Sequence, residues 1–166
     1  MWVVAKIKIK NLNIFKQSIS EKVGNDIKFY QPKLEYHRYF GDKVKKFEKF
    51  ILENYIFCYH ENFKKSNFIN AVRYSRGLEY FLEGHNENQK QILKFIEYCK
   101  SYENDKGYLT QSFFKTMITK KAKFVSGPFT NMIFEVIEKQ KNKLKILVGN
   151  VVTTISDKNN YLYRPI

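Results

Sequence analysis

Phe50-Ile-Leu-Glu-Asn-Tyr-Ile-Phe-Cys-Tyr59 is the stretch from which the rest of the chain is best interpreted. It is the densest apolar run of the sequence, and its aromatic and β-branched residues favour strands. The run is too short to cross a membrane as a helix. It therefore predicts a central, buried strand, with the segments on either side as its neighbours.

The composition is that of a basic globular chain. Of its 166 residues, 43% are hydrophobic and 17% are aromatic, which is typical of a folded chain and not of a disordered one. The formal net charge of +14 attracts anionic surfaces, above all phosphate backbones. The abundance of Lys, Asn, Ile, Tyr and Phe is also the bias expected of an AT-rich coding sequence, so two explanations of the charge stay open.

The sequence predicts a cytoplasmic protein with no membrane partner. Cys58 and Cys99 lie in apolar contexts without a CxxC partner, which indicates reduced thiols and not a disulfide framework. Lysines interrupt the N-terminal run 1–10, where a signal peptide needs an unbroken apolar stretch. We expect a monomer.

Strand and helix patterns alternate through the first hundred or so residues. Alternation predicts strands over residues 2–9, 27–40, 44–59 and 78–82, with Pro32 at an edge position or bulge and a turn at Gly41-Asp42. Helical spacing predicts three helices. The first is capped by Asn11 or Asn13 and ends at Gly24, the second covers residues 66–71, and the third is capped by Asn86.

From Lys120 onward, short alternating runs replace the helical patterns. They predict strands over residues 122–125, 132–137, 144–148, 151–155 and 161–163. Five short strands in about forty-five residues suit a small SH3-like barrel. Because the preceding segment loses its periodicity, we expect two domains, 1–104 and 119–166, joined by a linker over 105–118.

Four motifs occur in an order that resembles the NusG family of transcription elongation factors. They are a tryptophan-led first strand; Leu52-Glu-Asn-Tyr-Ile-Phe57, similar to "F-P-(G/N)-Y-(V/L)-F"; Val72-Arg-Tyr-Ser-Arg-Gly-Leu78, similar to "V-R-s-T-R-G-V"; and Ser126-Gly-Pro-Phe129, similar to the "x-G-P-F" turn of the KOW motif. The RfaH-like specialised paralogues are the more similar members for two reasons. They share the asparagine form of the motif, here Asn54, and they also lack the KOW glycine, whose place Phe134 takes here. Glu53 stands where the family has proline.

The resemblance implies both a fold and a function. The fold is α+β, with a NusG amino-terminal domain, an antiparallel sheet covered by helices, followed by a small all-β SH3-like KOW barrel. In family members the first domain binds the clamp helices of RNA polymerase, and the barrel recruits the small ribosomal subunit or the termination factor Rho. The chain is thereby identified as a candidate transcription elongation or antitermination factor.

The resemblance also implies residues for three binding sites. Polymerase binding is expected of Leu52, Asn54, Tyr55 and Phe57. Binding to non-template or upstream DNA is expected of Lys8, Lys10, Lys16, Arg73 and Arg76, with a solvated lysine-rich face as the alternative. Partner binding by the barrel is expected of Phe129, Val148, Gly149 and Asn150. Tyr55 and Phe57 are two residues apart and therefore share one face of a strand, although either ring taken alone is better explained as core.

The sequence carries no pattern typical of an enzyme. His37, His60 and His85 are far apart and lack metal-ligand spacing, and no nucleotide-binding or hydrolase motif occurs. We expect no catalysis, no metal and no cofactor. The second hypothesis is a general basic nucleic-acid- or ribosome-binding KOW protein that does not act on RNA polymerase. It predicts steeply salt-dependent binding to bare DNA or RNA.

Overall fold

Contacts in a computed structural model divide the chain into two units, Met1–Pro32 with Phe50–Ser101 and Lys33–Lys49 with Tyr102–Ile166. The structure describes residues 1–40, 43–110, 112–114, 120–156 and 161–166, without the side chains of residues 37–40 and 44. The turn predicted at Gly41-Asp42 lies outside the described residues, as do residues 111 and 115–118 of the expected linker. The domain boundaries expected from the sequence stay a prediction.

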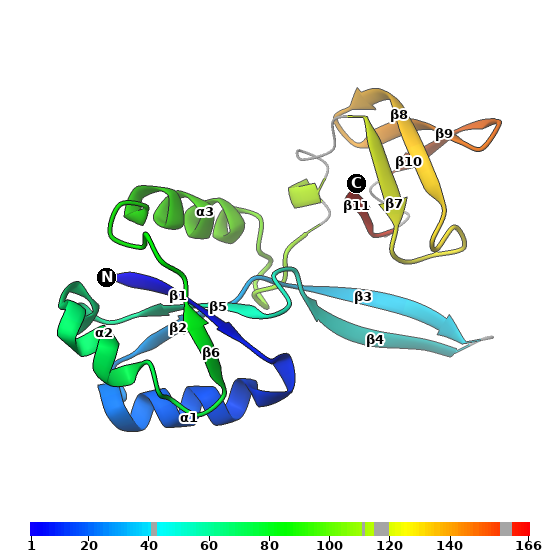
Figure 1. Cartoon of the computed structure of the whole chain (residues 1–166). Coiled ribbons are helices and arrows are strands. Elements are labelled where there is room, and N and C mark those ends of the chain that lie inside the picture. The colour runs from blue at the N-terminus through cyan, green and yellow to red at the C-terminus, as the bar shows by residue number, and fades with distance from the viewer. Residues whose placement is uncertain (41–42, 111, 115–119, 157–160) are drawn as a thin grey trace. The chain divides into compact units, whose positions relative to one another are not determined.

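The first unit contains a four-stranded antiparallel sheet in the order β2-β5-β1-β6 (Figure 1). Its strands are β1 (Trp2–Ile7), β2 (Lys28–Tyr30), β5 (Tyr55–Tyr59) and β6 (Leu78–Phe81). β5 comes from the stretch quoted first and lies between β2 and β1, which is the central position predicted for it. Because side chains alternate along a strand, Ile56 and Cys58 face one side of the sheet and Tyr55 and Phe57 the other.

Helices cover both faces of this sheet (Figure 1). On one face, α1 (Leu12–Val23) and α2 (Ser66–Val72) enclose a core that includes Phe15, Ile56 and Phe63. On the other face, α3 (Gln89–Ser101) packs its Ile96 against Val4 and Phe57. The short 3₁₀ helices η1 (Ile9–Asn11) and η2 (Glu61–Lys64) precede α1 and α2. The sheet is therefore the middle layer of three.

Two predicted strands are interrupted in the structure. The run 44–59 divides into β4 (Lys43–Phe50) and β5, because the Tyr55 amide donates a 2.6 Å hydrogen bond to the Leu52 carbonyl and closes a turn. The run 27–40 divides in the same way into β2 and β3 (Lys33–Phe40) on either side of Pro32. A proline has no amide hydrogen to donate to a ladder, so the pairing stops there.

The predicted helix caps are confirmed only in part. Asn11 occupies the N-cap position of α1, but its side chain makes no capping hydrogen bond, and Asn13 lies inside the helix. α3 begins at Gln89 and not directly after Asn86. The side chain that fixes the start of α3 is Gln89 itself, whose amide nitrogen donates to the carbonyl oxygens of Trp2 (2.6 Å) and His85 (2.7 Å).

The second unit contains a two-stranded hairpin of β3 and β4 with a segment bound at its base. The Leu109 amide donates to the Lys33 carbonyl at 2.8 Å, and the Tyr108 hydroxyl donates to the Glu48 carboxylate. The Lys33 ammonium lies 4.4 Å from the centre of the Tyr108 ring. These contacts raise the pKa of Tyr108 and lower the pKa of Glu48, in both cases mainly through their mutual hydrogen bond.

The second unit also contains a five-stranded antiparallel sheet, which we call the barrel, in the order β10-β9-β8-β7-β11 (Figure 1). Its strands are β7 (Lys121–Phe124), β8 (Ile133–Gln140), β9 (Lys143–Val148), β10 (Val151–Ser156) and β11 (Tyr163–Pro165). The last strand returns to pair with the first, and the sheet encloses one core around Phe124, Phe134 and Ile146. The α+β fold predicted from the sequence, a helix-covered antiparallel sheet followed by a small all-β unit, is confirmed.

Among the described helices, none is both long and apolar enough to cross a membrane.

Candidate functional site

The face of the first sheet that α3 covers carries a group of apolar side chains, which we call the aromatic cluster. Its buried members are Val4, Phe57 and Ile96, and its half-buried members are Trp2, Tyr30, Leu52, Tyr55, Leu82, Ile92 and Phe95. The ring of Phe57 lies 5.7 Å from that of Phe95 and 6.2 Å from that of Tyr30, between centroids. With 5% of its surface exposed, Phe57 is a core residue of this layer.

The other three residues predicted to bind polymerase lie at the rim of the aromatic cluster. Leu52 and Tyr55 are half-buried, and they are joined by the hydrogen bond that closes the turn before β5. Asn54 is exposed in that turn, and its carbonyl accepts a 2.7 Å hydrogen bond from the Ile7 amide. The four residues thus occupy one continuous turn and strand, with Tyr55 and Leu52 accessible and Phe57 beneath. Their role in binding stays a prediction.

Cations lie over several rings of this sheet. The Lys6 ammonium is 5.2 Å from the centre of the Tyr80 ring, and a hydrogen bond with Tyr80 raises the pKa of Lys6. Lys100 lies in the same way over Tyr30, at 5.5 Å. A cation over a ring is attracted by its negative face. The rings on this face therefore carry bound lysine cations, of which Lys6 is also paired with the Glu79 carboxylate at 3.5 Å.

The predicted DNA-binding lysines differ in exposure. Lys8 and Lys10 are exposed where the chain passes from β1 through η1. Lys16 is half-buried on α1, with its ammonium 5.5 Å from the centre of the Phe29 ring. Lys16 therefore contacts the protein's own sheet, whereas Lys8 and Lys10 present their charges to solvent.

The predicted arginines belong to a segment that packs against α1. The Arg76 amide donates to the buried Ser18 hydroxyl at 3.0 Å, and its guanidinium lies 3.9 Å from the Glu21 carboxylate. Gly77 has a φ of +82°, and a Cβ there would lie 3.0 Å from the Asn11 carbonyl oxygen. Only glycine fits this exit from helix to sheet. This packing places the arginine segment beside Asn11, which directly follows the predicted DNA-binding residue Lys10.

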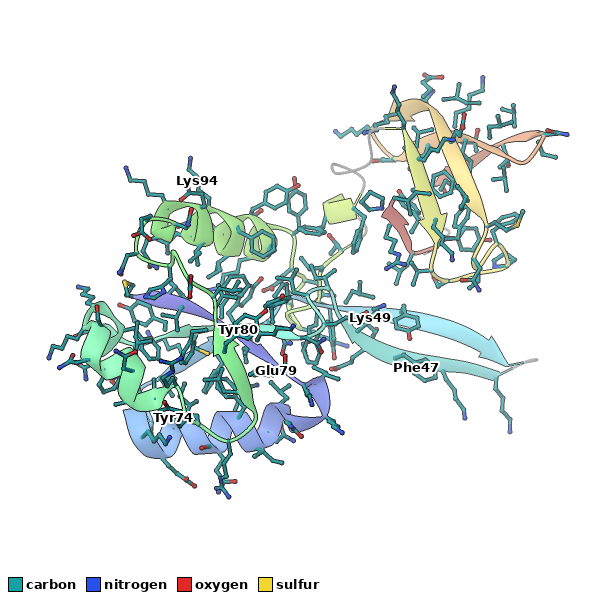
Figure 2. All side chains as sticks on the ribbon, in the orientation of Figure 1. Phe47, Lys49, Tyr74, Glu79, Tyr80 and Lys94 are labelled. Atoms are coloured by element: carbon teal, nitrogen blue, oxygen red, sulfur yellow. The ribbon has the colours of Figure 1, made fainter. Side chains whose placement is uncertain are left out.

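A hollow of about 420 Å³ lies between the end of α2 and β6. Arg73, directly after α2, lines it on one side, and Glu79 and Tyr80 line it from β6. Figure 2 labels the latter two side chains. The guanidinium of Arg73 lies 5.7 Å from the centre of the Tyr74 ring, which is 80% exposed. Sequence reasoning missed both tyrosines. The available signal was Tyr74 itself, an aromatic residue between two arginines in the exit motif.

The predicted partner-binding residues of the barrel lie in two turns. Phe129 follows β7 and is half-buried, with its ring 5.5 Å from Phe124 and 6.1 Å from Tyr161. Val148 is buried at the end of β9, and Gly149 and Asn150 form the exposed turn to β10. Gly149 has a φ of +58°, which suits the first central position of a tight hairpin turn. Their role in binding stays a prediction.

Two buried titratable side chains of the first unit, Cys58 and His60, serve packing. Burial raises the pKa of the Cys58 thiol far above its ordinary value, so this thiol stays protonated at neutral pH. His60 is buried, and its Nε2 lies 3.0 Å from an Asp26 carboxylate oxygen. Within the described ranges, no group of three or more His, Cys, Asp or Glu side chains is arranged to hold a metal ion.

Similar solved structures include a chain of an Spt4:Spt5 complex and a NusG chain. A chain of the MjSpt4:Spt5 complex in conformation B is 12% identical, with 96% of this chain and 94% of that chain covered and a TM-score of 0.28. NusG of Thermotoga maritima is 15% identical, with 99% and 96% covered and a TM-score of 0.31. No family model matches the sequence, and no curated protein matches it. At these scores, neither structure assigns the chain to a family.

Proposed function

We propose that the chain is a transcription elongation or antitermination factor of the NusG kind, similar to the RfaH-like paralogues. Its first unit binds the clamp helices of RNA polymerase through the rim of the aromatic cluster, at Leu52, Asn54 and Tyr55. Its barrel recruits a partner, either a ribosomal protein or Rho. The exposed cations Lys8, Lys10, Arg73 and Arg76 attract the DNA that is displaced nearby.

The observation that supports this proposal is the fit between each motif and its local structure. The Asn54-Tyr55-Ile56-Phe57 motif forms a turn and the central strand of the sheet. The Arg76-Gly77 motif leaves a helix and enters the sheet through a backbone that only glycine adopts easily. The Gly127-Pro128 motif connects the first two strands of the barrel. Three motifs that each adopt the local structure typical of the family, and that occur in the family's order, are unlike a chance match.

The rim of the aromatic cluster has the physical properties of a protein-binding hot spot. Half-buried tyrosine and leucine side chains are held in place by the packed layer beneath them, so little side-chain entropy is lost on binding. Glu53, at the tip of the same turn, is exposed and adds a negative charge that tunes the choice of partner. Binding to the closed clamp shifts polymerase away from its open, paused state, and the barrel raises the local concentration of a partner.

A pull-down with RNA polymerase tests the proposal. We expect Tyr55→Ala to weaken binding by about tenfold or more, because it removes an aromatic anchor from the rim. Ile14→Ala is the control, since it removes an exposed apolar side chain from α1, which covers the opposite face of the same sheet. Phe57→Ala is a poor test, because its ring is buried and its loss destabilises the fold. Undiminished binding by a folded Tyr55→Ala variant would overturn the docking surface.

The net charge of +14 favours a second function, binding to bare nucleic acid without polymerase. In that case affinity for DNA or RNA falls steeply as salt is raised, and Tyr55→Ala leaves it unchanged. Binding titrations at 50 and at 200 mM salt, run beside the pull-down, therefore separate the two functions.

A further inference from the structure

The outer face of the barrel can be followed row by row from the strand register. One row runs from Arg164 on β11 through Lys123 on β7 to Ile133 on β8. The next row consists of Lys121, Glu135, Leu147 and Val152, on four successive strands. A third row consists of Glu138, Lys145 and Thr154. Directly opposed residues share a face of the sheet, and the neighbouring positions Phe134, Ile146 and Tyr163 point into the core.

An apolar patch crosses strands β8, β9 and β10 of this face. Val152 is 53% exposed and lies opposite the half-buried Leu147 on the adjacent strand. Ile133, also 53% exposed, is a diagonal neighbour of Leu147. Ile137 and Val151, also on barrel strands, are exposed as well. We call Ile133, Leu147 and Val152 the outer patch.

Positive charges flank the outer patch on two sides. Arg164 and Lys123 lie in the row on one side, and Lys145 and Lys143 lie in the rows on the other. In the described part of the chain none of these four cations forms an ion pair. The carboxylate inside the patch row, that of Glu135, is paired with the Lys121 ammonium at 2.8 Å. Glu138 lies directly opposite Lys145 and adds one carboxylate to the third row, so the edges of the patch carry four cations against one negative charge.

We infer that the outer patch binds an amphipathic helix of another protein, with an apolar stripe flanked by aspartate or glutamate. An apolar centre with positive edges complements that pattern, and it repels a helix with basic flanks. Three neighbouring strands about 4.8 Å apart make the patch roughly 10 Å wide, which is the length of about two helical turns. This inference extends the recruiting role proposed for the barrel, and it does not depend on polymerase binding.

The surface is separate from the residues that the family resemblance assigns to the barrel's partner. Phe129 and Val148 have their side chains in or against the barrel core, and Gly149 and Asn150 form a turn. The outer patch lies instead on the opposite side of strands β8, β9 and β10, where the chain itself buries none of its members completely. A helix that covers the patch removes exposed apolar area from water, which supplies the driving force.

Fluorescence anisotropy with the full chain and two synthetic helical peptides tests the inference. Both peptides carry leucine at positions i, i+3, i+4 and i+7; one has glutamate on both flanks of the stripe and the other has lysine. We expect binding of the acidic peptide alone, weakened about tenfold by Val152→Ser and again by Lys145→Glu. Val151→Ser is the matched control, since Val151 is 65% exposed but lies at the next position of the strand, facing the other side. Lys94→Glu, on α3, is the control for charge (Figure 2).

Each alternative outcome contradicts the inference. Equal binding of the acidic and basic peptides shows non-specific apolar contact, and unchanged binding by Val152→Ser shows a different site. Binding of single-stranded RNA that Lys145→Glu abolishes, without binding of the acidic peptide, shows a nucleic-acid surface. A concentration-dependent dimer that Val152→Ser dissociates shows that a second copy covers the patch. The same variants are expected to pull down polymerase normally, so a failure here is distinct from a failure of the proposed function.

Discussion

The four-stranded sheet of the first unit and the barrel hide their apolar surface in different ways. The sheet of the first unit is covered by helices on both faces, and its central residues Ile56 and Phe57 are both buried. The barrel curls around one core and buries only its inner face, so that Ile133 and Val152 on its outer face stay exposed. A small meander without helices has no second layer to cover its outer face.

This difference separates two kinds of binding surface. In the first unit the rim of the aromatic cluster combines tyrosines with Leu52 at the margin of a packed layer, and Lys100 lies over the Tyr30 ring. In the barrel the outer patch is aliphatic and crosses three strands of one face, with lysines on two sides. A rim suits a partner that is itself rigid, whereas an open face suits a short segment that folds onto it.

The largest expected effect compares the two cores. Phe63→Ala and Phe124→Ala each delete a fully buried ring, at a cost of about 3–5 kcal/mol. Phe124 contacts four other rings in a small core, so we expect its loss to unfold the barrel and to leave the amide signals of β5 in place. Amide NMR spectra with chemical denaturation measure both. Simultaneous loss of β5 and barrel signals in Phe124→Ala would show that the two units fold as one.

Local chemistry made much of the fold predictable. The helical stripe of α1, the strand β6 after Gly77 and the five short runs of the barrel all follow from periodicity and turn residues. The break at Ile51–Asn54 did not follow, because apolar residues on both sides of Glu53-Asn54 continue the strand pattern through a turn. A periodic pattern shows only which residues are buried. A tight turn between two buried strands hardly changes that pattern, so the pattern does not reveal the turn.

A smaller effect compares two glycines with positive φ. Gly77→Ala places a Cβ 3.0 Å from a helix backbone oxygen, which cannot move aside, whereas Gly149→Ala meets no atom within 4 Å. We expect a loss of about 2–3 kcal/mol for Gly77→Ala and about 1 kcal/mol for Gly149→Ala, the second being the strain of the left-handed backbone alone. Thermal denaturation followed by circular dichroism measures the difference. Equal losses would mean that the contact with α1 adds nothing.

The candidate sites were less predictable than the fold. Tyr55 and Phe57 share a face, as their spacing requires, but only packing by α3 decides that Phe57 is buried while Tyr55 is accessible. The outer patch was not foreseen, because Ile133, Leu147 and Val152 come from three strands whose register is fixed by turns and a shift between Val136 and Glu138. Sequence periodicity assigns a face within one strand, and it does not say which strands are neighbours.

The smallest effect concerns the ion pair inside the barrel's outer face. Lys121 and Glu135 are both more than half exposed, so Lys121→Met is expected to change stability by less than about 0.5 kcal/mol. The same variant leaves the Glu135 carboxylate uncompensated beside the outer patch. We therefore expect binding of the acidic peptide to fall about two- to threefold, and to recover in Lys121→Met with Glu135→Gln, because the negative charge is then gone. A loss that persists in the double variant would mean that Lys121 itself contacts the peptide. A stability loss above about 1 kcal/mol would mean instead that the pair holds β7 against β8.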